Sequence, residues 1–261
     1  MKITDSDFKV WNPRQYLVEY FPPNVDAEPI VRFCVEESYK LPPKASVIDV
    51  GCGPTVCYWL SVAPRTQQLF LSDYLESNLV EQKKWVNQTA DCYDWSSYTR
   101  LILQYEGLKD VSAGRVMERE KQARQKVSGY YACDINEKNP LGELRQFDAV
   151  ISLCVADSIT DSKTVWERYM HNIFSLIRPG GLFIGAAMRN CTHYDIEQVQ
   201  YPATNVNEDD FRKLMLDYGF EPNSLRIKID QESHPMDHQK QKTQLRAEYD
   251  EIVLASGVLC S

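Results

Sequence analysis

The stretch Val47-Ile48-Asp49-Val50-Gly51-Cys52-Gly53-Pro54-Thr55 decides the fold. An apolar run enters a Gly-x-Gly turn, which is typical of a buried strand followed by a ligand-binding loop and a helix. A dinucleotide-binding loop has a third glycine where this chain has Val56. Pro54 also lacks the amide donor that a phosphate would need. The loop therefore favours a ligand without a pyrophosphate.

Short apolar runs, separated by helical stretches, continue along the chain from this strand. Further strands are predicted at 68–72, 130–133, 147–153 and 181–187, with helices at 75–86, 116–126, 163–177 and 208–218. Two last strands, 224–229 and 251–255, flank a polar loop at 234–246. This pattern predicts an α/β fold. We expect a doubly wound, Rossmann-like, seven-stranded sheet with five parallel strands and a C-terminal antiparallel hairpin at its edge.

The first 42 residues are rich in aromatic residues and proline. Prolines delimit two predicted helices there, at 13–20 and 26–39. We expect residues 1–42 to form an N-terminal helical lid on a ligand-binding domain of residues 43–261. The alternative is that this segment only packs as an N-terminal cap.

Composition and charge argue against several kinds of partner and site. The chain has 261 residues and a net charge of −8, which disfavours nucleic acid as a partner. No run of about 18 apolar residues and no signal peptide is visible, so we expect a cytoplasmic protein without a membrane partner. The eight cysteines form no CxxC or zinc-type spacing, which predicts reduced thiols and no metal site. The absence of heptads or an apolar tail favours a monomer.

Acidic residues follow three successive predicted strands: Asp49, Asp73 and Asp134. Asp73 lies about 20 residues past the glycines, where an acid accepts hydrogen bonds from a ribose. Tyr74 can cover an adenine face, Asp134 can accept the adenine amine, and Ile135 can supply an apolar wall. Because ligands bind at the carboxyl ends of such strands, this set predicts a nucleoside that carries positive charge. S-adenosylmethionine fits that description.

These motifs resemble class I S-adenosylmethionine-dependent methyltransferases. The N-terminal Trp11-Asn12-Pro13-Arg14-Gln15-Tyr16-Leu17 is similar to the N-P-R-x-Y-L signature of one branch, the nicotinamide, phenylethanolamine, indolethylamine and thioether methyltransferases. The resemblance extends from about residue 11 to residue 255. It implies a small-molecule methyl acceptor and S-adenosylhomocysteine as a product.

The resemblance also implies roles for individual residues. Tyr16 and Tyr20 would close over the cofactor, with Tyr16 near the methyl-transfer centre. The remaining cofactor residues that it implies are Gly51, Gly53, Thr55, Asp73, Tyr74, Asn78, Asp134 and Ile135, beside Asp49 from the reasoning above.

The acceptor side differs from the nicotinamide enzymes of that branch. Ala187 stands where they have an aspartate and Cys191 where they have a serine, which argues against nicotinamide as the substrate. Asp157 could pair with an amine and take its proton, or it could only cap a helix. Arg189 could hold an acceptor carboxylate or point to solvent. Tyr194 could pack against a flat acceptor or in the core, and Glu248 is a further candidate acid.

The sequence thus predicts an enzyme that transfers a methyl group from S-adenosylmethionine to a nitrogen of a small amine. Two alternatives stay open within this class of site: methylation of sulfur or of a heterocyclic nitrogen, and a homologue that binds the cofactor without catalysis. A nicotinamide-dependent reductase on the same type of sheet is disfavoured by Val56 and Pro54.

Overall fold

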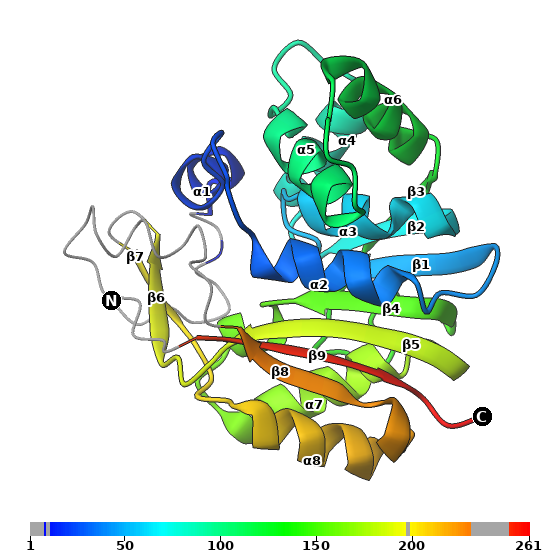
Figure 1. Ribbon diagram of the computed structural model, residues 1–261. Coiled ribbons are helices and arrows are strands. Elements are labelled where there is room, and N and C mark those ends of the chain that lie inside the picture. The colour runs from blue at the N-terminus through cyan, green and yellow to red at the C-terminus, as the bar shows by residue number, and fades with distance from the viewer. Residues whose placement is uncertain (1–7, 9–10, 197–198, 231–250) are drawn as a thin grey trace.

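The computed structural model describes residues 8, 11–196, 199–230 and 251–261 (Figure 1). The helices are α1 (Pro13–Tyr20), α2 (Pro29–Ser38), α3 (Cys57–Val62), α4 (Glu76–Val86), α5 (Ser96–Tyr105), α6 (Ala113–Arg124), α7 (Lys163–Phe174) and α8 (Glu208–Tyr218). The strands are β1 (Ala45–Val50), β2 (Thr66–Asp73), β3 (Val127–Ala132), β4 (Phe147–Leu153), β5 (Ile177–Met188), β6 (His193–Ile196), β7 (Val199–Pro202), β8 (Arg226–Asp230) and β9 (Ile252–Val258).

Seven of these strands form one sheet in the order β3-β2-β1-β4-β5-β9-β8. Strands β1 to β5 are parallel, whereas β9 runs antiparallel to both β5 and β8. The predicted seven-stranded sheet with a C-terminal antiparallel pair is therefore confirmed. The chain leaves β1 toward β2 on one side, and β4 pairs on its other side. A ligand crevice is expected at this switch point.

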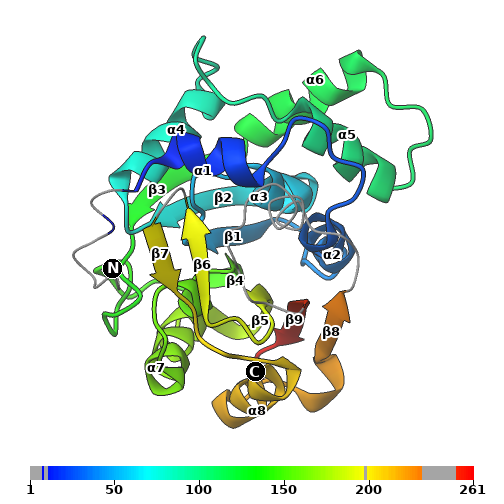
Figure 2. The same cartoon turned by 90° about the vertical axis from the view of Figure 1, so that its left-hand side faces the viewer.

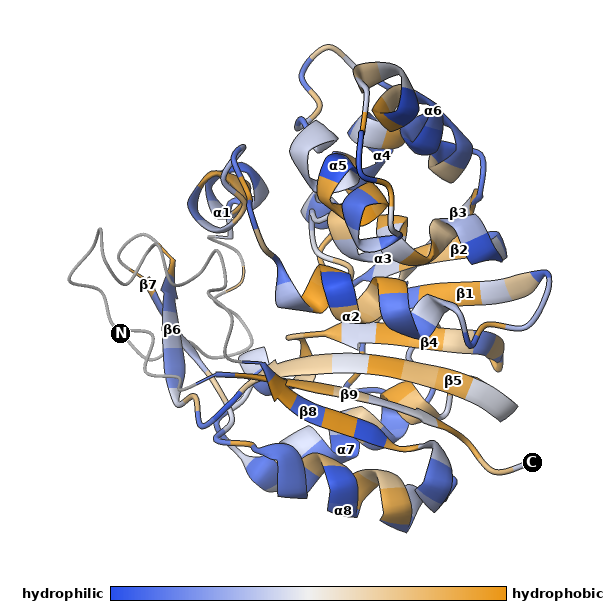
Figure 3. Ribbon diagram, viewed as in Figure 1, coloured by the Kyte–Doolittle hydropathy of each residue, from blue (hydrophilic) through white to orange (hydrophobic). Residues whose placement is uncertain are grey.

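Helices cover both faces of the sheet, and its central strands are mostly apolar (Figure 3). Alternate residues of β1 enter opposite cores: Val47 packs with the cluster that holds α2 and α3, and Ile48 with the cluster that holds α7 and α8. Side chains alternate across a strand, which explains why the buried parallel strands appear in the sequence as continuous apolar runs.

Local signals set several helix ends. The side chain of Asn12 accepts hydrogen bonds from the first turn of α1, which Pro13 begins. Gly219 ends α8 at a φ of 111°. The helix expected to reach residue 177 ends instead at Phe174. Ile177 pairs with Phe147 of β4 and therefore begins β5. The helical periodicity of the sequence extended too far because this apolar residue fits either element.

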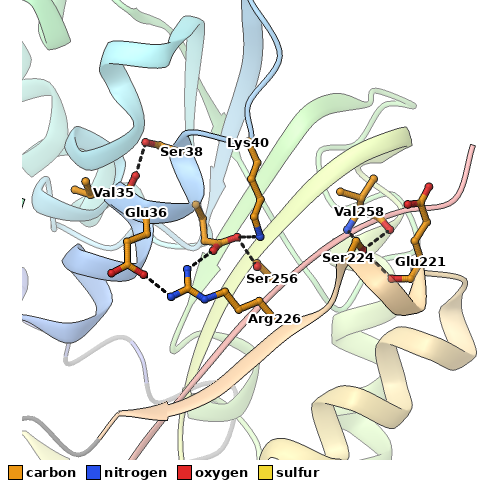
Figure 4. Close-up of polar contacts among 10 residues, drawn as sticks. Val35, Glu36, Ser38, Lys40, Glu221, Ser224, Arg226, Ser256 and Val258 are labelled. Carbon is orange, nitrogen blue, oxygen red and sulfur yellow. Dashed lines mark hydrogen bonds and ion pairs between the residues drawn. The ribbon is translucent and has the colours of Figure 1, made fainter. Parts of the chain in front are cut away.

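Helix α2 lies in the layer of helices on the sheet and packs against α3, β5 and β9. Glu37 of α2 is fully buried and reaches the sheet edge, where Arg226 of β8 and Ser256 of β9 donate hydrogen bonds to its carboxylate. Figure 4 shows this cluster together with Glu36 and Lys40. Charged contacts thus tie α2 to the C-terminal strands.

Helix α1 and the β6–β7 hairpin both lie at the carboxyl ends of the parallel strands (Figure 2). This hairpin and helix α5 were not anticipated from the sequence. No helix within the described ranges is long and apolar enough to span a bilayer.

Candidate active site

The glycine loop leaves β1 in a left-handed backbone conformation, with φ of 69° at Gly51 and 57° at Gly53. A Cβ at Gly51 would lie 2.5 Å from Cγ1 of Val155, whereas a Cβ at Gly53 would meet nothing closer than 3.9 Å. Gly51 is therefore required for its conformation and for close packing, and Gly53 for its conformation alone.

A cavity of about 340 Å³ opens beside this loop. Residues from the ends of β1, β2, β3 and β4 line it, together with residues of the N-terminal arm (residues 8–20). Its described lining is Phe8, Trp11, Tyr16, Asp49, Gly51, Cys52, Gly53, Pro54, Thr55, Tyr58, Asp73, Tyr74, Leu75, Asn78, Cys133, Asp134, Ile135, Asn136, Leu153, Cys154, Val155, Ser158, Ile159, Tyr169 and Tyr194. Most of the predicted cofactor residues are thus brought together at one site.

Asp73 lies at the centre of the hydrogen bonds around the loop. Its Oδ2 accepts the N–H of Gly53 at 2.8 Å, and its Oδ1 accepts the N–H of Leu75 and the side-chain amide of Asn78. Burial raises the pKa of Asp73, although these donors oppose the shift. Oδ1 already accepts two donors, but Oδ2 accepts only one. Because a carboxylate has about four lone-pair sites, Oδ2 of Asp73 can also accept a hydroxyl group from the cavity.

Asp49 is 2% exposed, and its Oδ2 has no hydrogen-bond partner among the described residues. Burial, together with the neighbouring Asp73, raises the pKa of Asp49 to about 8. A buried carboxylate is costly unless a cation or a donor meets it. Because Asp49 lines the cavity, this orphaned oxygen fits a ligand that carries an ammonium group.

Asp134, Ile135 and Tyr74 contribute to the wall of the same cavity. Oδ1 of Asp134 accepts the backbone N–H of Asn136 at 2.9 Å, which holds this carboxylate in place. Ile135 is 7% exposed, whereas Tyr74 is 63% exposed. The wall thus offers one acid, one apolar side and one open aromatic ring, as a flat base requires.

Tyrosines from three other elements also line the cavity. Tyr16 from α1, Tyr58 from α3 and Tyr194 from β6 all line it, and Tyr194 donates a hydrogen bond to the carbonyl of Ser158 at 3.1 Å. Burial raises the pKa of all three phenols, so they stay protonated near neutral pH. Tyr16 and Tyr58 can donate hydrogen bonds, whereas the hydroxyl of Tyr194, whose hydrogen is donated to Ser158, can only accept one. All three rings can pack against a flat group, but the phenols are poor bases.

Tyr20 does not line the cavity. Its ring stacks on Tyr16, with centroids 5.0 Å apart, and its hydroxyl donates to the carbonyl of Asp195 at 2.5 Å. It therefore supports Tyr16 from behind and links α1 to the β6–β7 hairpin.

Asp157 lies just behind the cavity wall and is not one of its lining residues. Oδ2 accepts the N–H of Met188 at 3.1 Å, and the backbone carbonyl accepts the N–H of Thr204 at 2.7 Å. Burial raises the pKa of Asp157 to about 7. These contacts join the end of β4 to the end of β5 and to the segment after β7.

Three other residues expected to contact the acceptor also lie away from the cavity lining. The guanidinium of Arg189 pairs with Glu208 at 2.8 Å and with Glu251 at 3.6 Å. Ala187 is fully buried, and the buried Sγ of Cys191 donates to the carbonyl of His193. The expectations for Arg189 as a carboxylate anchor, and for Ala187 and Cys191 as direct contacts, thus gain no support from their positions. Glu248 and the loop 234–246 lie outside the described residues.

Sequence reasoning did not single out several lining residues, among them Trp11, Tyr58, Cys154 and Tyr169. Cys154 follows β4 directly at a φ of 54°, unusual for a residue other than glycine. Because ligands bind at the carboxyl ends of parallel strands, its place directly after a predicted strand could have identified it as a lining residue. Tyr58 and Tyr169 lie inside helices, where an inward aromatic cannot be told from a core residue by spacing.

Comparison with known proteins agrees with this geometry. The family model described as the NNMT/PNMT/TEMT family matches residues 2–247. The chain belongs to this family. It is 26% identical to the indolethylamine N-methyltransferase of Oryctolagus cuniculus, covering 82% of this chain and 83% of the relative. It is also 26% identical to the nicotinamide N-methyltransferase of Homo sapiens, covering 83% and 84%.

The fold is also that of a methyltransferase. The N-methyltransferase NodS from Bradyrhizobium japonicum WM9, solved with S-adenosylhomocysteine, superposes with a TM-score of 0.54 at 13% identity over 95% of this chain and 97% of that one. Membership in the NNMT/PNMT/TEMT family makes the protein an S-adenosylmethionine-dependent methyltransferase, as the sequence predicted.

Proposed function

We propose that this family member transfers a methyl group from S-adenosylmethionine to a nitrogen of a small-molecule amine. One observation carries the proposal: a single cavity joins a cluster of three acids, suited to a cationic nucleoside, with a wall of tyrosines, suited to a flat acceptor. The relatives named above are N-methyltransferases, which supports nitrogen as the accepting atom.

In this proposal the acids hold the cofactor. Asp49 faces its ammonium group, Asp73 accepts the ribose hydroxyls with Asn78 beside it, and Asp134 with Ile135 and Tyr74 receives the adenine. Gly51, Gly53 and Thr55 bring the loop close to the methionine part. The bound cofactor supplies an electrophilic methyl group, so the protein's own task is to align the acceptor and exclude water.

The acceptor is then held by Tyr16, Tyr58 and Tyr194. Their protonated hydroxyls can orient a polar atom, and their rings can pack on an aromatic or heterocyclic acceptor. Asp157 lies behind this wall, and we propose that it positions the wall through Met188 and Thr204 rather than receiving the amine proton. The proton then leaves through water.

Within the predicted lid, helix α1 and the residues just before it reach the cavity. Tyr16 stands over it, Arg14 pairs with Glu81 of α4 at 3.1 Å, and the hydroxyl of Tyr93 donates to the carbonyl of Phe21. We propose that α1 closes the site over bound cofactor, since closure shields methyl transfer from water. Helix α2 belongs to the layer on the sheet and stays in place.

A methyl-transfer assay with a panel of acceptors tests the function. Release of S-adenosylhomocysteine is measured with primary amines, pyridine-type heterocycles and thiols, each at the same concentration. Turnover confined to amines supports the proposal, and turnover with heterocycles or thiols alone replaces it with the corresponding alternative. Binding of S-adenosylhomocysteine without turnover on any acceptor would indicate a homologue without catalysis.

We also propose that the enzyme works as a cytoplasmic monomer on free small molecules, without nucleic acid or membrane partners. The net charge of −8 supports the exclusion of nucleic acid. Light scattering of the purified protein tests the monomer.

A further inference from the structure

Trp11 precedes α1 and reaches into the hydrogen bonds around the cofactor cavity. Its indole Nε1–H donates to Oδ1 of Asn78 at 2.8 Å. Asn78, on α4, is 4% exposed, and its Nδ2 donates to Oδ1 of Asp73 at 3.0 Å. Asp73 in turn accepts the N–H of Gly53 at 2.8 Å. A continuous chain of hydrogen bonds therefore runs from the N-terminal arm to the glycine loop.

The indole determines which end of the Asn78 amide faces Asp73. An amide has a donor end and an acceptor end, and an indole N–H can only meet the acceptor end. With Oδ1 occupied by Trp11, the donor end of Asn78 points at the carboxylate. If the amide turned over, its oxygen would face the Asp73 carboxylate and leave a buried repulsive contact.

We propose that Trp11 is a positioning residue for cofactor binding. Acting through Asn78, it holds Asp73 in the orientation that accepts the ribose hydroxyls, and the N-terminal arm thereby becomes part of the cofactor site. This inference rests on the proposed role of Asp73. It also predicts that cofactor binding and docking of the arm favour one another, because each requires the same orientation of Asn78.

The competing role for Trp11 is packing alone. Its ring lies 5.0 Å from that of Tyr16 and meets Tyr201 edge-on at 5.9 Å. Trp11→Phe keeps an aromatic ring at this position and removes the donor, and a second Trp→Phe variant accounts for the smaller ring. Trp166→Phe is the matched control. The Nε1 of Trp166, in α7, is buried without a hydrogen-bond partner among the described residues, and Trp166 does not line the cavity.

The test is calorimetric titration of S-adenosylhomocysteine into the full-length wild type, W11F, N78A, the double variant W11F/N78A and W166F. We expect W11F to weaken binding about three- to tenfold, the value of one hydrogen bond, and W166F to bind like the wild type. In the double variant, W11F should add nothing to the effect of N78A. In turnover assays, W11F should raise the KM for S-adenosylmethionine and leave kcat within about twofold of the wild type.

The inference is overturned by wild-type affinity in W11F. It is also overturned by a double variant that loses the product of the two single effects, since independent packing gives additive free energies. A W11F loss that is matched by W166F would also overturn it. If the wild type itself does not bind S-adenosylhomocysteine, the proposed cofactor site fails first. The two failures are therefore distinguishable.

Discussion

The indole Nε1–H of Trp59 donates a hydrogen bond to Oε1 of Gln82 across 3.1 Å, with both side chains fully buried. The amide of Gln82 then donates to the carbonyls of Gly53 and Thr55 at 2.9 and 2.8 Å. Gln82 lies one helical turn after Asn78 on α4, so one face of this helix holds both the glycine loop and Asp73.

We expect Gln82→Ala to destabilise the protein by about 2–3 kcal/mol, because it leaves the indole of Trp59 and two loop carbonyls without this partner. The freed loop should also weaken binding of S-adenosylhomocysteine. Urea denaturation and calorimetry measure the two effects. Gln104→Ala, at an exposed position of α5, is the control and should change neither. Wild-type stability in Gln82→Ala would show that the hydrogen bonds of Gln82 do not stabilise the fold.

Asp49 should make cofactor affinity depend on pH. Its pKa of about 8 leaves it protonated at pH 6, and a bound ammonium favours the ionised form. Affinity for S-adenosylhomocysteine should therefore rise from pH 6 to pH 7.5, by at most about tenfold per unit.

Titration calorimetry across this range checks the expectation for Asp49. Asp49→Asn should bind more weakly at pH 7.5 and show a flatter profile. If the variant retains the wild-type slope, the pH dependence comes from another group, and Asp49 does not face the ammonium.

A variant of Asp157 can show whether this residue positions the cavity wall or takes part in proton transfer. Its pKa is raised from 3.8 to about 7 on folding, so the unfolded state holds fewer protons between these values, and the stability from this group is lost as pH rises from about 4 to 7. Asp157→Asn removes the titration. The melting temperature of Asp157→Asn, relative to that of the wild type, should therefore rise by several degrees between pH 4 and pH 7.

Asp110→Asn, at an exposed site, should leave the melting profile of the protein unchanged. We also expect Asp157→Asn to retain kcat within about threefold. A loss of a hundredfold or more in a stably folded variant would instead make Asp157 the group that receives the amine proton.

Glu37 and Glu36 form a matched pair on α2. Burial alone would raise the pKa of Glu37, but hydrogen bonds from Lys40, Ser256 and Arg226 outweigh it and lower the pKa below 4.5. Glu37→Gln should therefore cost about 2 kcal/mol at pH 7. Glu36 is 37% exposed where it meets Arg226, and Glu36→Gln should cost less than 1 kcal/mol.

The stability that Glu37 provides is present above pH 4.5 and is lost as pH falls through its lower folded pKa. The difference between wild type and Glu37→Gln should shrink accordingly in acid, as measured by urea denaturation at pH 3 and pH 7. Equal costs for the two variants at pH 7 would contradict the buried role of Glu37.

The sheet could be predicted from the sequence alone, and so could the meeting of several candidate cofactor residues at one cavity. Buried parallel strands are continuous apolar runs, so β1 and β4 were visible without any contact information. Asp73 and Asp134 could be placed because each follows a strand, and the carboxyl ends of parallel strands meet at one edge. Both residues line the cavity together with Asp49.

The positions of the predicted acceptor residues and the supports of the glycine loop could be seen only in the tertiary structure. Trp11 is 67 positions from Asn78, and Trp59 is 23 from Gln82, so no local spacing links either pair. Asp157 and Ser158 are adjacent in the chain, yet only Ser158 lines the cavity. Whether a side chain after a strand enters the site or turns behind it depends on the backbone direction and on long-range partners such as Met188. Neither the backbone direction nor the long-range partner can be predicted from the neighbouring residues in the sequence.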